Sequence, residues 1–462
     1  MTCQPPSLTL AALMVFSPLA AANPPGPACM VWSAPEVIRS LADGRVAANR
    51  VAVGMDGTGR AILLYGETSA DNPTEETVYA RHRAAQGVWG DPVPVWQTVV
   101  GSDARPSYLA LSVGANGHAL ASGRRADNTL RPTRMAAYDP DTGWQAPVEL
   151  LDMAGDFSPP TVAVGPDGRG LAAWVATTRH RIRARAWAPA TGWGPDEQVT
   201  PGRSSLRSPK LAVNARGQAL LTYGQGSRGD DVYARFRNAH GAWGRATQLN
   251  VRNGGLLEEI MGPQPALNAA GDAWVTWSDR RGRIRTVMVS SFDRHTRRWL
   301  ETPVPLSALD VDAEDPVLRL NEQGQMLVGW HQSYFLYLHD NKERIQTRLY
   351  TPSQGWGPVN DLNRRGRSSG TPGLALDEAG NATTVWPQIT PNRGWHLHTL
   401  AQPMGAPAVS GRLHANGSVA TEPWQMADGE GRHAIVVFIR QESPGGSREL
   451  VSQVGQLGDC PP

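Results

Sequence analysis

The sequence predicts an all-β fold, a closed β-propeller of about eight four-stranded blades. Three observations lead to this prediction: a strand–turn–strand pattern that recurs from end to end, a composition with 49 glycines and 37 prolines, and the absence of long amphipathic helical stretches. Because internal repeats override the usual relation between length and domain number, we expect the 462 residues to form one repeat array rather than about three separate domains.

Each copy of the repeat reads as a proline, alternating apolar residues, a tight turn ending in glycine, and a second apolar run that ends in an aromatic residue. The clearest copy spans residues 209–223, with Leu211 and Val213 alternating along its first strand. Proline suits a strand start that needs no ladder hydrogen bond, and glycine permits the positive φ of a tight hairpin. We therefore expect two antiparallel strands in every copy, the second buried on both faces.

The turn glycines recur with a period of about 53 residues. They are Gly59, Gly117, Gly168, Gly217, Gly271, Gly324, Gly380 and Gly431. After a variable loop comes a third strand, such as residues 232–236, and a short turn with a Gly-Trp or similar pair opens a fourth. The tryptophans of this pair, which we expect to pack between blades, are Trp89, Trp144, Trp193, Trp243, Trp299 and Trp356. Eight blades follow, with seven as the alternative because the unit after Trp386 is irregular.

The two ends of the chain are expected to close the ring. The last unit lacks a fourth strand, and residues 31–38 match the fourth-strand segment at residues 143–150. The N-terminal strand would thus complete the last blade. Closure would bring Cys29 next to Cys460, and we expect these two cysteines to form a disulfide in an oxidising compartment.

Residues 1–22 have the features of a secretory signal peptide. Residues 8–19 form an apolar run, and a small-residue cleavage site ends at residue 22. The run is too short to cross a bilayer, so no membrane span is predicted. We expect a periplasmic or secreted protein whose mature part, residues 23–462, is a single propeller domain and a monomer.

The charge balance and the motifs argue against several partners. The net charge is only +2, which gives no bulk attraction for nucleic acid or for an anionic membrane. Metal signatures such as HExxH or CxxC are absent from the sequence. The glycine-rich pieces are hairpin turns with no helix following, so they are not phosphate loops. No metal or other cofactor is therefore expected.

One turn resembles the aspartate box of sialidase-like propellers. Residues 139–144, DPDTGW, carry the aspartates and the Gly-Trp pair, whereas residues 188–193 and 351–356 keep only the pair. The chain is thus similar in turn and strand order to exported bacterial sialidase-like propellers and their non-catalytic relatives, over nearly its whole mature length. The resemblance implies the propeller fold, and no catalytic residue can be matched through it.

Any binding site is expected on the face that carries the variable loops. Turns within strand pairs are short and uniform, whereas the second-to-third strand loops and the connections between blades are long and different. That face is rich in arginine, which suits carboxylate, sulfate or phosphate groups, and its longest insertion holds histidine and tyrosine. The candidate ligand-binding residues are Arg124, Arg179, Arg228, Arg281, Arg365, His331, Tyr334 and His339.

Three functional hypotheses remain open. The first is a non-catalytic exported propeller that binds an anionic glycan or an envelope protein, because the scaffold is regular and no convergent acid–base set is visible. The second is a glycan-active enzyme, either a sialidase-like hydrolase or a polysaccharide lyase acting on an acidic glycan. The third is an envelope assembly scaffold. A deep central pocket with a carboxylate or tyrosine beside arginines would favour the enzyme.

Overall fold

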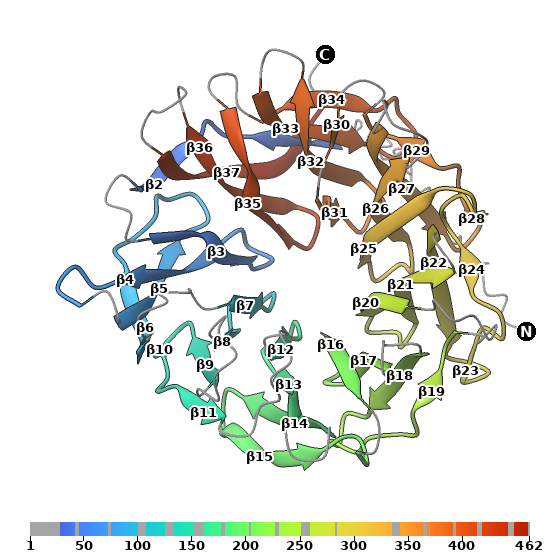
Figure 1. Ribbon diagram of the computed structural model, residues 1–462, viewed down its shortest axis with the longest axis horizontal. Helices are drawn as coiled ribbons and strands as arrows, with labels where there is room; N and C mark the ends of the chain where they lie inside the picture. Colours follow the sequence, from blue (N-terminus) through green and yellow to red (C-terminus); the bar gives the residue numbers. More distant parts are fainter. Residues whose placement is uncertain are drawn as a thin grey trace, which may run out of the picture.

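Eight antiparallel sheets form the blades of a ring in the computed structural model of the chain (Figure 1). The structure describes residues 28–41, 46–72, 75–99, 108–124, 133–150, 160–176, 181–202, 205–226, 231–250, 259–281, 284–334, 342–363, 367–368, 370–390, 394–413, 418–441 and 448–460. All elements assigned within these ranges are strands. The predicted all-β class and the eight four-stranded blades are confirmed, and the seven-blade alternative is wrong.

Blades 1 to 4 follow the chain from the innermost strand outwards. Blade 1 contains β3 (Val46–Met55), β4 (Ala61–Thr68), β5 (Glu75–Arg83) and β6 (Val93–Val99). Blade 2 contains β7 (Tyr108–Val113), β8 (Ala119–Arg124), β9 (Thr133–Asp139) and a fourth strand split into β10 (Gly143–Trp144) and β11 (Val148–Leu150). Blade 3 contains β12 (Thr161–Val164), β13 (Gly170–Ala176), β14 (Arg181–Ala188) and β15 (Gly192–Gln198). Blade 4 contains β16 (Leu206–Val213), β17 (Ala219–Gln225), β18 (Asp231–Arg237) and β19 (Thr247–Gln248).

Blades 5 to 8 repeat this order, again with several split strands. Blade 5 contains β20 (Glu259–Leu267), β21 (Ala273–Arg281), β22 (Ile284–Asp293), β23 (Arg298–Trp299) and β24 (Val304–Pro305). Blade 6 contains β25 (Asp312–Leu320), β26 (Met326–Tyr334), β27 (Lys342–Thr351), β28 (Gly355–Trp356) and β29 (Asn360–Asp361). Blade 7 contains β30 (Arg367–Ser368), β31 (Gly373–Leu376), β32 (Ala382–Thr390), β33 (Gly394–Gln402) and β34 (Val409–Arg412). Blade 8 contains β35 (Ser418–Gly429), β36 (His433–Gln441), β37 (Arg448–Asp459), β1 (Ala28–Trp32) and β2 (Glu36–Ser40).

The second strand of a blade is its most buried element, because both of its faces pack against neighbouring blades. Every residue of β13 is buried, as are the first six residues of β4. The turn that precedes this strand is the one predicted from the repeat. All eight turn glycines have positive φ, from 70° at Gly217 to 94° at Gly271. The repeat period therefore marks the first hairpin of each blade.

Aromatic side chains fill the seams between blades. The rings of Trp299 and Phe236 in the preceding blade lie 5.9 Å apart, and those of Trp356 and Trp274 lie 6.1 Å apart. Trp144 donates its Nε1–H to Nε2 of His82 in blade 1 at 3.1 Å. Burial lowers the pKa of His82, which favours the neutral imidazole that can accept this bond. These tryptophans thus pack between blades, as the regular spacing predicted.

The ring closes in blade 8, where the N-terminal segment supplies the fourth strand. β1 pairs antiparallel with β37, with Ala28 opposite Asp459. Residues 33–35 interrupt the predicted single strand, so β2 begins at Glu36 and pairs with β37 separately. Cys29 and Cys460 form a disulfide with their Cα atoms 4.7 Å apart and a sequence separation of 431. Ring closure by the N-terminal strand and the disulfide are both confirmed.

The alternation of strands divides the ring into two faces. We call one the turn face: it carries the turns between first and second strands and between third and fourth strands. We call the other the loop face: it carries the second-to-third strand loops and the connections between blades. The innermost strands β3, β7, β12, β16, β20, β25, β31 and β35 surround the centre of the ring (Figure 1). A side chain at the start of an innermost strand therefore lies near both the loop face and the centre.

Candidate functional site

The predicted ligand-binding residues are spread over several blades of the loop face. Arg124 ends β8 in blade 2, Arg281 ends β21 in blade 5, and Tyr334 ends β26 in blade 6. Blades 5 and 6 are neighbours, whereas β8 lies far from them around the ring (Figure 1). The side chains of these three residues lie outside the described structure, as do the whole residues Arg179, Arg228, Arg365 and His339. Their roles stay predictions.

His331, which is described, lies in a polar cluster at the seam between blades 5 and 6. It is opposite Glu314 of β25, and its Nδ1 lies 3.8 Å from a Glu314 carboxylate oxygen. The residue is 9% exposed. Its Nε2 is buried and has no hydrogen-bond partner within the described ranges. An orphaned buried nitrogen of this kind calls for an explanation, and a ligand group is one that fits a loop-face site.

Arg285 joins this cluster from β22 of blade 5. Its Nη1 lies 2.8 Å from Glu314 and 3.2 Å from Asp312, and its backbone N–H donates to Asp312 at 2.7 Å. The contact with His331, and after it the charge of Arg285, hold the pKa of Glu314 below its usual range against the effect of burial. Glu314 is therefore an ionised acceptor at neutral pH.

Asp315 occupies a strained position beside these groups. Its φ is 53°, in the left-handed region, where the β25–β26 pairing shifts between Glu314 and Val317. In blade 5 the residue before the equivalent proline is Gly262, with φ 57°, so glycine would meet the backbone requirement better. Asp315 is exposed, yet the surrounding protein desolvates its carboxyl and, together with the charge of Glu314, raises its pKa. Ser208 has φ 49° before the equivalent proline of blade 4, so the positive φ belongs to the repeat, and the raised pKa is what distinguishes Asp315.

The cluster offers two kinds of chemistry. Carboxylates, an imidazole and a guanidinium can accept and donate hydrogen bonds to sugar hydroxyls. Two neighbouring carboxyl groups whose pKa values shift in opposite directions, Glu314 down and Asp315 up, also provide the elements of an acid–base pair. We define the loop-face cluster as Arg285, Asp312, Glu314, Asp315 and His331.

Several other arginines at the loop face are paired within their own blades. Arg134 contacts Glu149 at 2.6 Å, Arg344 contacts Asp361 at 2.7 Å, and Arg440 contacts Glu449 at 2.7 Å. In each case the partner lies on the neighbouring strand of the same sheet. These guanidinium groups hold adjacent strands together at the loop face and are neutralised there.

On the turn face, a nearly buried carboxyl links blades 6 and 8. Asp428 near the end of β35 has a side chain that is 8% exposed; it accepts the N–H of Gly431 at 2.7 Å and lies 3.5 Å from Arg319 of β25. Burial raises the pKa of Asp428 to about 6, despite the opposing charge of Arg319. The carboxyl is therefore poised to gain a proton in mildly acidic solution.

Asp428→Asn is expected to change the pH dependence of stability. Because folding raises the Asp428 pKa to about 6, the protonated carboxyl adds to the free energy of unfolding. This contribution is complete below about pH 4 and is lost as the pH rises through 6. Between about pH 4 and pH 7.5, the free energy of unfolding of the wild type should fall by about 2–3 kcal/mol relative to the variant. Urea denaturation of both proteins at the two pH values measures this. An equal difference at both pH values would contradict it.

Within the described ranges, no group of three or more histidine, cysteine, aspartate or glutamate side chains is arranged to hold a metal ion. The same ranges contain no helix with the length and hydropathy needed to span a membrane.

The fold and its closure define the chain as an eight-bladed β-propeller. No protein-family model matches its sequence, and no curated protein matches it. Many solved structures are nevertheless similar in three dimensions. These similarities concern architecture, because the identities below are far too low to indicate a common activity.

Two of the similar structures are a polysaccharide lyase and a lectin. A PL25 ulvan lyase bound to -[GlcA(1-4)Rha3S]- superposes with a TM-score of 0.53 at 9% identity, covering 90% of this chain and 95% of the lyase. The BP39L lectin from Burkholderia pseudomallei superposes with a TM-score of 0.50 at 11% identity, covering 79% of this chain and 99% of the lectin. Both likenesses show the propeller fold.

Proposed function

We propose that the chain is an exported β-propeller that binds a glycan through its loop face. The loop-face cluster carries this proposal: at the start of the innermost strand β25 it gathers three carboxyl groups with the guanidinium of Arg285 and the imidazole of His331, whose Nε2 has no hydrogen-bond partner within the described ranges. Such a set can satisfy many hydroxyl groups at once. The arginines predicted for the loop face would add contacts to acidic substituents.

Other observations support parts of the proposal. The leader predicted at residues 1–22 and the Cys29–Cys460 disulfide suit an oxidising compartment, the periplasm or the exterior. Solved propellers of similar architecture include a lyase with a bound glycan and a lectin. A sialidase-like origin is part of the same proposal. The DPDTGW turn supports it, since Asp139 accepts the N–H groups of Asp141 and Thr142 at 2.9 and 3.1 Å.

The double variant Glu314→Gln, Asp315→Asn should bind the glycan at least about tenfold more weakly, a loss of about 1.4 kcal/mol or more. Both changes keep side-chain shape, and asparagine tolerates the left-handed backbone at Asp315. Calorimetric titration of the mature protein against neutral, uronic-acid and sulfated oligosaccharides first identifies the ligand and then measures the loss.

Asp361→Asn is the matched control, because it removes a carboxylate from the same blade away from the innermost strand, where Asp361 contacts Arg344. It should bind like the wild type. If the double variant and the wild type bind with equal affinity, the loop-face cluster is not part of the binding site. If no glycan of the panel binds, the next experiment is a pull-down that searches for an envelope-protein partner.

Catalysis on the glycan is the second candidate, and Asp315 favours it. A carboxyl with a raised pKa beside the ionised Glu314 and the free nitrogen of His331 resembles the separated acid and base of a hydrolase or lyase site. Chromatography of the same titration mixtures tests this candidate. Product that forms with the wild type and disappears with Asp315→Asn, while binding persists, would establish the enzyme. Binding without product supports the non-catalytic protein.

A further inference from the structure

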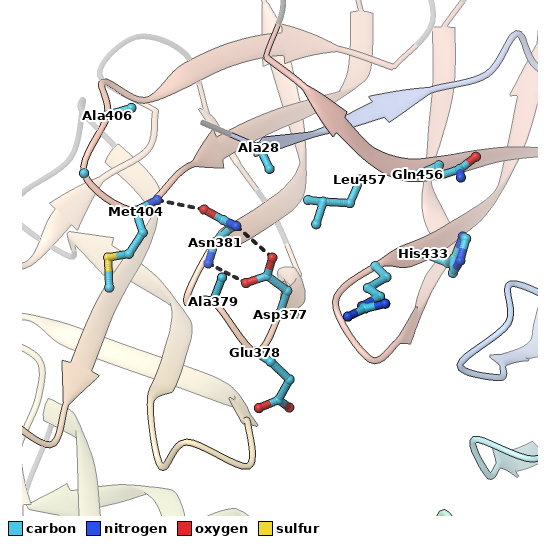
Figure 2. Close-up of a pocket in the computed structure, with 12 residues that line it drawn as sticks. Ala28, Asp377, Glu378, Ala379, Asn381, Met404, Ala406, His433, Gln456 and Leu457 are labelled. Carbon is cyan, nitrogen blue, oxygen red and sulfur yellow. Dashed lines mark hydrogen bonds between the residues drawn. The ribbon is translucent and has the colours of Figure 1, made fainter. Parts of the chain in front are cut away.

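A pocket of about 760 Å³ lies on the turn face between blades 7 and 8 (Figure 2). The loop-face cluster lies on the other face of the ring, between blades 5 and 6. Its volume falls within the range of small-molecule sites. The walls come from the two turns of blade 7, from the first turn of blade 8, and from the paired ends of β37 and β1. The lining includes Asn381, Met404, Arg432, Gln456, Leu457 and Ala28.

The pocket exists because of the way the ring closes. In other blades a hairpin turn connects the third and fourth strands, whereas in blade 8 these strands are the two ends of the described chain. In blade 7 the corresponding hairpin, which includes Met404 and Gly405, has no tryptophan, unlike the hairpins of blades 1 to 6. The seam therefore lacks a connecting turn and stays open on the turn face, although Trp32 of β1 packs within it in a cluster with Leu397 and Phe438.

Hydrogen bonds hold the pocket wall in place. Asn381 donates its backbone N–H and its side-chain N–H to the two carboxylate oxygens of Asp377, both at 2.7 Å, and its Oδ1 accepts the N–H of Met404 at 2.8 Å. Across the pocket, Leu457 donates its N–H to the carbonyl oxygen of Arg432 at 2.8 Å. Figure 2 shows these contacts on the side of blade 7. The pocket is preformed, so binding requires little ordering.

Arg432 supplies a positive charge that forms no ion pair with the part of the chain that the structure describes. The residue follows the turn glycine, a position that Arg60 and Arg169 hold in blades 1 and 3. There each arginine contacts an aspartate of its own turn, Asp56 at 2.6 Å and Asp167 at 3.6 Å. Within the described ranges, the side chain of Arg432 has neither an ion-pair nor a hydrogen-bond partner.

A shift in the last turn explains why Arg432 is free. In blade 1, Asp56 accepts the N–H of Arg60, four residues later. In blade 8 the equivalent Asp428 instead accepts the N–H of Gly431 and contacts Arg319 of blade 6. The backbone N–H of Arg432 turns to the carbonyl of Gly429. The acid that would neutralise Arg432 is thus engaged elsewhere.

The other polar groups of the pocket are largely satisfied. Asp377 is 4% exposed and is bound by Asn381. Both oxygens of Glu378 accept the N–H of Glu322 at 3.1 Å, and Glu378 points away from Leu457 (Figure 2). Leu457 and Ala28 point toward Asn381 and form an apolar wall, while Met404 is 43% exposed at the rim. The pocket thus combines the guanidinium of Arg432 and an apolar wall with two carboxyl groups, the buried Asp377 and the outward-directed Glu378, whose acceptor oxygens are engaged by protein N–H groups.

A second turn-face pocket shows that the free charge is not a general property of the seams. It has about 600 Å³ and lies between blades 3 and 4. Its Arg237 donates to both oxygens of Glu197, which also accepts Trp243 Nε1–H at 2.8 Å. Its Arg169 contacts Asp167. This pocket has similar walls with its arginines paired, and it provides the control.

We propose that the pocket between blades 7 and 8 is a second binding site, specific for an acidic sugar unit. Arg432 holds the carboxylate or sulfate group, the wall of Leu457 and Ala28 packs against the C–H face of the ring, and Gln456 bonds a hydroxyl. The sugar as ligand class rests on the proposed function, whereas the preference for one oxyanion rests on Arg432 alone. With sites on opposite faces, one molecule would link two glycan chains.

Methyl NMR of ¹³C-methionine-labelled mature protein tests the site directly. Met404 lines the pocket, and its signal among the methionines of residues 23–462 is identified by its loss in Met404→Leu. Three ligands are titrated: a uronic-acid disaccharide, a sulfated monosaccharide and a neutral disaccharide. The Met404 signal should shift with one or both acidic sugars and stay in place with the neutral one. Equal shifts with the neutral sugar, or no shift with any of them, would overturn the proposal.

Arg432→Gln should weaken the acidic-sugar affinity read at Met404 at least about tenfold, because one charge-assisted pair is lost. Arg169→Gln removes an arginine from the same repeat position in blade 3 and should leave that affinity unchanged. Unchanged binding by Arg432→Gln, or an equal loss in Arg169→Gln, would refute the role of Arg432. The Glu314→Gln, Asp315→Asn protein should keep the Met404 shift, which separates failure of this site from failure of the loop-face site.

Discussion

Replacing Trp330 with alanine should lower the free energy of unfolding by about 3–5 kcal/mol. Trp330 is fully buried at the blade 5–6 seam, in a cluster with Trp274, Val289 and Leu318. Its Nε1–H also donates to Gln346 at 3.0 Å. Alanine would leave a cavity in a seam that cannot collapse, because the ring fixes the neighbouring blades. Urea denaturation followed by circular dichroism measures the change.

Two further variants make the Trp330 result specific. Trp330→Phe keeps most of the ring volume and loses the hydrogen bond, so its loss should be clearly smaller than that of alanine. Val88→Ala changes a residue that is 75% exposed and should stay within about 0.5 kcal/mol of the wild type. A Trp330→Ala protein as stable as Val88→Ala would mean that the seam is not a cooperative part of the fold.

Loss of the Cys29–Cys460 disulfide should cost about 2–4 kcal/mol. The bridge spans a sequence separation of 431, so it restricts the unfolded chain over nearly the whole described length. It also fastens β1 to β37, the one place where a blade is assembled from both ends of the chain. The double variant Cys29→Ser, Cys460→Ser avoids an unpaired thiol. Its denaturation midpoint, compared with that of the oxidised wild type, measures the loss.

Reduction of the wild type provides the control for the disulfide. The reduced wild type should match the double variant, and mass spectrometry without reductant should find no free thiol at either cysteine. A double variant with the midpoint of the oxidised wild type would show that strand pairing alone closes the ring. Free thiols at these cysteines in the native protein would show that the disulfide does not form.

The fold was predictable because it repeats. Each turn glycine marks a hairpin that needs positive φ, and the Gly-Trp pairs mark seams, so local chemistry appears once per blade. Closure was predictable for the same reason, since residues 31–38 resemble the fourth strands of other blades. Splitting of the fourth strand into two pieces was not foreseen, because a short break leaves the apolar pattern unchanged.

The candidate sites were predictable only in part, because they join different blades. His331 was recognised as a residue type suited to a site, but Arg285 was not, since nothing near it in sequence indicates that β22 lies against β25. Asp315 is one of several acids between residues 310 and 315, and its positive φ becomes visible only in the structure. Arg432 and Arg169 both follow a turn glycine, so the sequence does not distinguish them. Arg432 lacks an ion-pair partner in the described structure because Asp428 contacts Arg319, whereas Arg169 contacts Asp167.

The meeting of β1 and β37 also fixes the direction in which the protein can be attached to something else. Ala28 and Asp459 lie opposite each other at the turn face, beside the pocket of Arg432. A linker joined directly at Ala28 or Asp459 would therefore start on the turn face. An affinity tag at either position risks crowding the pocket while leaving the loop-face cluster accessible. Immobilised protein would report on the loop face, and untagged protein is the form in which to study the pocket.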